Sequence, residues 1–206
     1  MRTIMPHAAT ITVTPEHVRA LEEATLGSLL VWYEATNRVT RTRPDDVPGP
    51  EGMIIAGIDT PNGIIEQAID NGDDYSDAYM ASNLTDIAND SLADWPRVKA
   101  LTPAVTDLRT DLSLRSCHLA DGPLSCEVKG EYFLTDTYRS AHRPEVILQV
   151  TIAFMQTSPT RVRILRADGR SEVMRFHLDL QGPRPGMSSR LLTGAIEAAL
   201  SALPSV

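Results

Sequence analysis

Residues 160–178 read TRVRILRADGRSEVMRFHL, and this stretch shows most clearly which kind of fold the chain adopts. Apolar and polar side chains alternate on both sides of an Ala-Asp-Gly turn sequence at residues 167–169. Alternation with a period of two residues is typical of a β-strand with one buried face and one solvated face. A three-residue loop aligns the apolar sides of the two strands. The stretch therefore predicts an antiparallel hairpin, and its solvated face gathers four basic side chains, Arg161, Arg163, Arg175 and His177.

The alternating pattern extends back to Val105, so residues 105–180 are predicted to form an antiparallel sheet of four or five long strands. Residues 120–122 repeat the Ala-Asp-Gly sequence and predict a second hairpin between the segments of Cys117 and Cys126. In the three-residue register Cys126 lies on the buried face and Cys117 on the solvated face. A one-residue slip would expose an apolar face. We therefore expect both cysteines to be reduced.

Helices are predicted before and after this sheet in the sequence. Thr14 and Pro15 are typical of a helix start, and the apolar spacing extends this helix to about Asn37. Residues 38–52 contain three Pro, two Gly and three Arg and are predicted to form a long loop or arm. Further helices are expected over residues 60–69 and over residues 187–203 at the C-terminus. Asp74 and Asp77 are spaced as in a capping arrangement, and the helix that follows them is expected to extend to about Leu92.

The order of these elements predicts an α+β fold. In this fold a long-stranded, curved antiparallel meander of four to five strands packs against the N-terminal helices and one C-terminal helix. We expect residues 1–206 to form a single domain, because a chain of this length can bury one sizeable core. Folds of this kind often enclose a pocket between the sheet and a helix, although the fold itself does not indicate a function.

The charge of the chain is unevenly distributed. The formal net charge is −8, with 16 acidic and 7 basic residues in positions 1–100 but 11 and 12 in positions 101–206. We do not expect nucleic-acid binding, because it depends on clustered positive charge. No apolar run approaches the roughly 18 residues that span a bilayer, and residues 1–10 lack the apolar core of a secretion signal. We therefore expect a cytoplasmic protein without a membrane partner, or a virion component.

The motifs that could carry catalysis or bind a metal are weak. Asp111, Glu127 and Lys129 match the D…(D/E)xK pattern of metal-dependent nucleases, but their predicted strand positions separate the two carboxylates by on the order of 13 Å. Residues 70–77 are rich in carboxylates but lack the spacing of a calcium loop, and they are typical of a helix end followed by a helix cap. The five histidines lack the spacing of a zinc site. We expect no catalytic residue, metal or cofactor, and a nuclease is a remote alternative.

Two functions remain open at this point. The first is a non-catalytic binding or assembly module, such as a homo-oligomeric structural subunit of a virion or another ring-forming component. Its partner would be a copy of itself or another acidic protein. The partner-binding residues would be Arg161, Arg163, Arg175, His177, Arg41 and Arg43. The alternative is a small-molecule-binding protein or enzyme with a pocket between the sheet and the helices.

Overall fold

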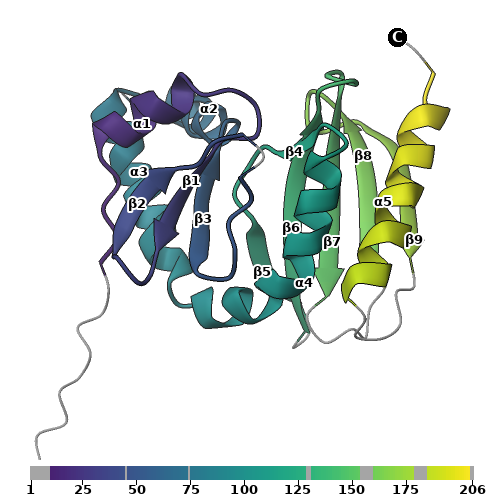
Figure 1. Cartoon of the computed structure of the whole chain (residues 1–206). Coiled ribbons are helices and arrows are strands. Elements are labelled where there is room, and N and C mark those ends of the chain that lie inside the picture. The colour runs from purple at the N-terminus through teal and green to yellow at the C-terminus, as the bar shows by residue number, and fades with distance from the viewer. Residues whose placement is uncertain are drawn as a thin grey trace, which may run out of the picture.

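The computed structural model describes residues 10–44, 46–73, 75–128, 131–153, 160–178 and 185–204 (Figure 1). No helix among these residues is long and apolar enough to cross a membrane. The elements in chain order are α1 (Pro15–Glu22), β1 (Leu29–Tyr33), β2 (Arg38–Arg41), β3 (Gly52–Gly57), α2 (Thr60–Asn71), α3 (Asp77–Ser91), α4 (Trp95–Ser113), β4 (Cys117–Leu119), β5 (Leu124–Val128), β6 (Glu131–Ser140), β7 (Val146–Ala153), β8 (Thr160–Arg166), β9 (Glu172–Leu178) and α5 (Pro185–Ala202).

The strands form two antiparallel sheets. The smaller sheet has the order β2-β1-β3, and the larger has the order β4-β6-β7-β8-β9, with β5 also paired to β6. Strands β4 and β5 lie end to end along the same edge of β6, because Leu119 pairs with Tyr138 and Leu124 pairs with Thr135. The α+β class with an antiparallel meander is therefore confirmed.

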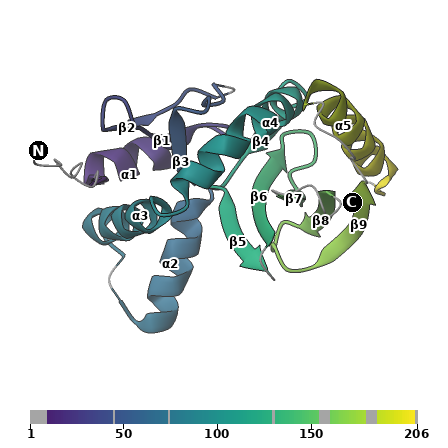
Figure 2. The ribbon, with the colours of Figure 1, turned by 90° about the horizontal axis from the view of Figure 1, so that it is seen from below.

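Helices α4 and α5 cover one face of the larger sheet, which curves around them (Figure 2). Side chains alternate along each strand, so Tyr138, Leu148 and Ile164 pair across neighbouring strands and point to the same side. All three are almost completely buried. They pack in one core with Leu108 of α4 and Ile196 of α5. The hydrophobic burial that stabilises this sheet therefore lies on its helix-covered side.

The smaller sheet has its own hydrophobic core. Strand β1 is buried along most of its length, and its Leu30 and Trp32 pack with residues of α1 and α3. The indole ring of Trp32 meets that of Trp95 at the start of α4 in a T-shaped arrangement, with ring centroids 6.5 Å apart. Aromatic rings prefer this edge-to-face geometry because the positive edge of one ring approaches the negative face of the other.

Several sequence predictions are confirmed. Helix α2 ends before Gly72, which adopts a left-handed conformation with a φ of 75°. The helix predicted to extend to about Leu92 is α3. Its cap is the Ser76 hydroxyl, which accepts a hydrogen bond from the backbone N–H of Tyr79, whereas Asp74 of the predicted cap lies outside the described residues. The predicted C-terminal helix is α5. In the β8–β9 hairpin the four basic side chains share one face, as the alternation predicted. The predicted three-residue register is wrong, because Arg161 pairs with His177 and Arg163 with Arg175 beyond a register shift between Ile164 and Leu165.

The predicted first helix is too long. Helix α1 ends at Glu22, and residues 29–33 form strand β1 instead of continuing the helix to about Asn37. Their sequence, LLVWY, is apolar without interruption, because the strand is central and buried. Such a run shows neither the period of a half-exposed strand nor that of a helix, so its hydrophobic pattern does not distinguish the two. The prediction of a loop over residues 38–52 is also wrong in part, because Arg38–Arg41 is β2 and pairs with β1.

The predicted sheet over residues 105–180 begins too early. Residues 105–113 belong to α4, and Val105, Leu108 and Leu112 are buried at the spacing of one helix face. The hairpin predicted around residues 120–122 is also wrong, because β4 and β5 both pair with β6 and not with each other. Cys117 is consequently buried, not solvated, and is a free thiol. The side chain of Cys126 lies outside the described residues.

The connection between β4 and β5 joins the two sheets. The Ala120 carbonyl oxygen accepts a hydrogen bond of 2.9 Å from the backbone N–H of Asp59, just after β3. Gly57 is required at the end of β3, since an added Cβ would lie 2.3 Å from that same oxygen. The side chains of Thr60 and Asp121 are hydrogen-bonded across the junction. These contacts explain why the chain needs a small residue and a tight connection here.

Candidate functional site

The side of the larger sheet away from α4 and α5 carries polar side chains in continuous rows. One row contains Thr137, Gln149, Arg163 and Arg175, and the next contains Thr135, Thr151, Arg161 and His177. We call these eight residues the polar face. Arg161, Arg175 and His177 are exposed, whereas Arg163 is half-buried. The structure therefore brings four of the six predicted partner-binding residues together on one surface.

Glu172 partly neutralises this face. Its Oε2 lies 2.7 Å from Nε of Arg163 and 2.7 Å from Nη2 of Arg175. Hydrogen bonds from Arg175 and Arg163 lower the pKa of the Glu172 carboxyl. Arg163 also donates a hydrogen bond of 3.3 Å to Oε1 of Gln149. Arg161 has no ion-pair partner among the described residues, so its charge is the most available to an incoming molecule.

Arg41 and Arg43 do not belong to this surface. Arg41 lies on β2 at an edge of the smaller sheet, and its Nη1 is 3.5 Å from the carbonyl oxygen of Ala20. Strands β2 and β9 lie at opposite ends of the molecule (Figures 1 and 2). The six predicted residues therefore form two separate basic regions.

An acidic region lies on the N-terminal half. Residues 44–96 contain 12 Asp or Glu and no Lys, Arg or His. This run is visible in the sequence, although a balance taken over 100 residues hides it. Four of its carboxylates are exposed on two helices, which we call the acidic helical surface: Glu66 and Asp70 of α2, and Asp86 and Asp90 of α3.

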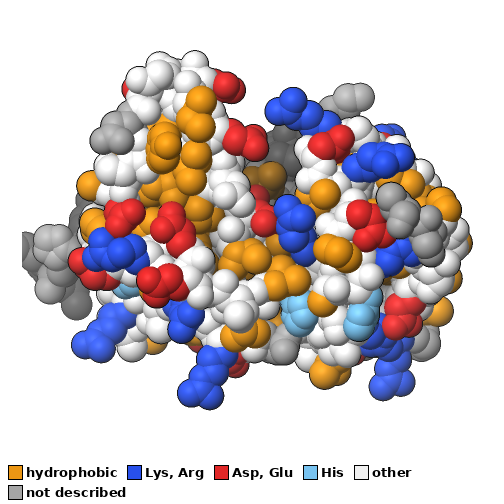
Figure 3. All heavy atoms as spheres, turned by 90° about the horizontal axis from the view of Figure 1, so that it is seen from above, with side chains coloured by type: hydrophobic (Ala, Val, Ile, Leu, Met, Phe, Trp, Pro, Cys, Tyr) orange, Lys and Arg blue, Asp and Glu red, His pale blue; other side chains and the backbone are white. Residues whose placement is uncertain are grey.

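Exposed apolar side chains accompany these carboxylates. Ile69 of α2 is 59% exposed and Ile87 of α3 is 40% exposed. Figure 3 shows hydrophobic and acidic side chains close to one another on this half of the molecule. Mixed surfaces of this kind are common where proteins bind one another, because apolar contacts add affinity to charge complementarity.

A buried ion pair links α4 to β6. Arg109 donates from Nε to Oδ2 of Asp136 at 2.7 Å and from Nη2 to Oδ1 at 2.8 Å. The Tyr138 hydroxyl donates to Oδ2 of Asp136 at 2.9 Å. Burial raises the pKa of Tyr138. Burial also opposes the charge of Arg109, but the attraction and hydrogen bonds of Asp136 outweigh it and raise the pKa of the guanidinium. Arg109 is therefore charged, and its guanidinium is held in the core by the Asp136 carboxylate.

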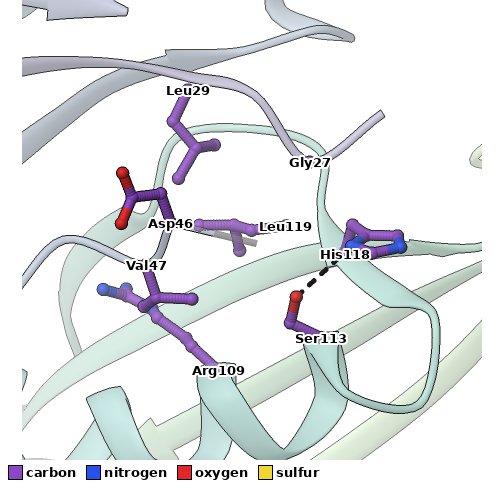
Figure 4. Close-up of a pocket in the computed structure, with 8 residues that line it drawn as sticks. All are labelled: Gly27, Leu29, Asp46, Val47, Arg109, Ser113, His118 and Leu119. Carbon is purple, nitrogen blue, oxygen red and sulfur yellow. Dashed lines mark hydrogen bonds between the residues drawn. The ribbon is translucent and has the colours of Figure 1, made fainter. Parts of the chain in front are cut away.

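A small cavity lies beside Arg109 between the two sheets (Figure 4). Ser113 Oγ and His118 Nδ1 are 3.4 Å apart at its wall, but the Asp46 carboxylate points away from His118. The cavity holds about 10 Å³, which is space for about one water molecule. A serine, a histidine and an aspartate thus line the same cavity without the mutual contacts of a catalytic triad and without space for a substrate.

The residues that match the nuclease pattern do not lie at the strand positions predicted for them. Asp111 lies on helix α4, not on a strand, and its Oδ2 accepts a hydrogen bond of 2.6 Å from the Ser189 hydroxyl. Glu127 is on β5, but its side chain is not described, and Lys129 lies outside the described residues. Residues 70–77 contain the end of α2 and the start of α3. Within the described part of the chain, no three His, Cys, Asp or Glu side chains are grouped to hold a metal ion.

The evidence for function comes from these local features, because the comparisons with known proteins found no match. No protein-family model, curated protein or solved structure matches this chain.

Proposed function

We propose that this protein is a non-catalytic assembly module in which the polar face of one copy binds the acidic helical surface of the next copy. The observation that supports this proposal is the separation of two oppositely charged surfaces. Residues 160–178 contain five Arg and two acidic residues, whereas residues 44–96 contain 12 acidic residues and no basic ones. Opposite charge accelerates association and favours this pairing over contacts between like surfaces.

The positions of the two surfaces favour head-to-tail association. Strand β9 and helix α3 lie at opposite ends of the molecule, so the same two surfaces cannot face each other within one copy (Figure 1). A contact between different surfaces repeats from copy to copy, and it closes into a ring or extends into a filament. A ring-forming or virion subunit that assembles in the cytoplasm would have these properties.

Strand β2 is not part of the proposed interface. It is an edge strand, and Arg38, Arg41 and Arg43 lie on it or just after it. Positive charge on an edge strand discourages pairing with another edge, and the basic side chains of the polar face of a second copy would be repelled. We therefore place Arg41 and Arg43 outside the head-to-tail interface, where they would contact a different acidic partner.

Charge reversal tests the proposal. One variant carries Arg161→Glu with Arg175→Glu, and the other carries Asp86→Lys with Asp90→Lys. Each should be monomeric alone, because the charge of one of its two surfaces no longer complements the other. A mixture of the two should form complexes that neither forms alone, because the first variant keeps its acidic helical surface and the second keeps its polar face.

A control variant, Arg38→Glu with Arg190→Glu, has the same net charge as the first but changes residues outside both surfaces. It should assemble like the unmodified protein. Native mass spectrometry of each variant and of the mixture gives the masses. If both reversed variants assemble as well as the control, the proposed surfaces are wrong.

A further inference from the structure

The larger sheet ends in an open edge at β9 (Figure 1). This strand is the last in the order β4-β6-β7-β8-β9, and among the described residues it pairs only with β8. With seven residues it is the longest of the strands that lie at the end of a sheet. Every second residue of such a strand directs its backbone N–H and C=O away from the sheet. An extended chain can therefore continue the sheet by pairing with β9.

The apolar rows of the sheet are incomplete at β9, on the side that faces the helices. One row consists of Leu148, Ile164 and Met174, and the next row includes Val162 and Phe176. The members of these rows on β7 and β8 are at most 3% exposed, whereas those on β9 are only half-buried, although they pack against the same core. A further strand with an apolar residue at every second position would cover Met174 and Phe176.

The other side of β9 determines which charge this further strand should carry. Arg175 and His177 are exposed there, next to Arg161 and Arg163 of β8. Glu172 accepts hydrogen bonds from Nε of Arg163 and from Nε and Nη2 of Arg175, so it balances one of these charges. Among the described residues, Nη1 of Arg175 and the ring of His177 make no hydrogen bond, so both remain able to donate to a carboxylate.

The same charges disfavour pairing of β9 with an edge strand of a second copy. In a full-length antiparallel pair of two β9 strands, Arg175 would lie opposite Arg175 of the other copy. The edge strand β2 presents Arg38 and Arg41. Like charges directly opposite one another destabilise a strand pair. The strand that fits β9 is therefore an acidic strand from a different protein.

We propose that β9 is a docking edge for an extended segment of another protein in which apolar residues alternate with Asp or Glu. The backbone of this segment would pair with β9, and its apolar side chains would cover Met174 and Phe176. Its carboxylates would bind Arg175 and His177. This inference goes beyond the proposed function and does not depend on it, because it does not need the acidic helical surface.

Peptide binding tests this inference. The probe is the peptide VEVEVEV, acetylated and amidated, which has the length of β9, and its counterparts are VKVKVKV and the composition-matched VVVEEEV. Isothermal titration calorimetry on the Asp86→Lys with Asp90→Lys variant, whose β9 is unchanged, separates peptide binding from self-assembly. VEVEVEV should bind at one site per chain and about tenfold more tightly than either counterpart, because it alone combines acidic charge with alternation. Equal binding of VEVEVEV and either counterpart, or no binding at millimolar VEVEVEV, would overturn the proposal.

Hydrogen exchange measured by NMR locates the bound peptide. The backbone N–H groups of β9 that point away from β8 should exchange about tenfold more slowly with saturating VEVEVEV than without it. The protected groups should alternate along residues 172–178, because only every second N–H faces the edge. The N–H groups of the other open edge, β2, should not change. A peptide that binds without protecting alternate N–H groups of β9 would contradict the proposal.

Charge reversal tests the part of Arg175. Arg175→Glu should invert the preference, so that VKVKVKV binds more tightly than VEVEVEV. Arg161→Glu is the matched control, because it makes the same change of charge on β8, on the order of 10 Å from an added strand and largely screened at 0.15 M salt. It should leave VEVEVEV as the preferred peptide. An unchanged preference in Arg175→Glu, with circular dichroism showing a folded protein, would overturn the assignment of an acidic partner.

Discussion

Removing the buried guanidinium of Arg109 should cost much of the stability of the fold. Arg109 and Asp136 are 4% and 1% exposed, and Arg109→Met would leave the Asp136 carboxylate buried with only the Tyr138 hydroxyl as a donor. Breaking one side of such a pair costs about 3–5 kcal/mol. With a urea dependence of about 2 kcal/mol per molar, the unfolding midpoint should fall by roughly 1.5–2.5 M.

Replacing the whole cluster should restore stability. In the triple variant Arg109→Met, Asp136→Leu and Tyr138→Phe, no polar group remains to be satisfied, and apolar replacements of buried ion pairs are often neutral. Urea unfolding followed by tryptophan fluorescence gives both values, with Arg190→Met on exposed α5 as the control. A loss below about 1 kcal/mol for Arg109→Met, or a triple variant as unstable as the sum of the single changes, would refute this reasoning.

Two other predictions concern glycine and pH. Gly57→Ala should destabilise the protein by about 1–3 kcal/mol because its Cβ would meet the Ala120 oxygen. Gly63→Ala on exposed α2, where nothing lies within 4 Å, should stabilise it by roughly 0.5–1 kcal/mol; thermal unfolding of both variants checks the opposite signs. Asp168 accepts hydrogen bonds from the Ser171 backbone, the Ser171 hydroxyl and the Arg170 backbone, which lower its pKa to about 2. Its carboxyl carbon should titrate there by NMR, and the stability it contributes should be present above pH 4 and lost as the pH falls towards 2; a midpoint near 4 would contradict these contacts.

The sequence predicts an element best where a regular pattern is bounded by turn residues. The β8–β9 hairpin is of this kind, because a shift by one residue would expose Val162 and Ile164. Residues 29–33 are apolar on every side, so their period gives no information. In residues 105–113 the buried positions fit a helix, but the segment directly precedes the alternating strands, and the sequence does not mark a boundary between them.

Long-range pairing explains what the sequence does not reveal about the sites. The turn residues 120–122 do not indicate that β4 and β5 share one edge of β6. Arg41 and Arg43 resemble the arginines of β8–β9 in the sequence, but they flank a different sheet.

The mass of the protein in solution tests the central claim most directly. Light scattering on a sizing column should be carried out at about 0.01 M and about 1 M salt, where charges are screened beyond about 30 Å and about 3 Å. Assembly through opposed charges predicts a mass well above the 22.5 kDa of one chain at low salt and a return to that value at high salt. A single chain at both concentrations, or a larger mass that salt does not change, would contradict the claim.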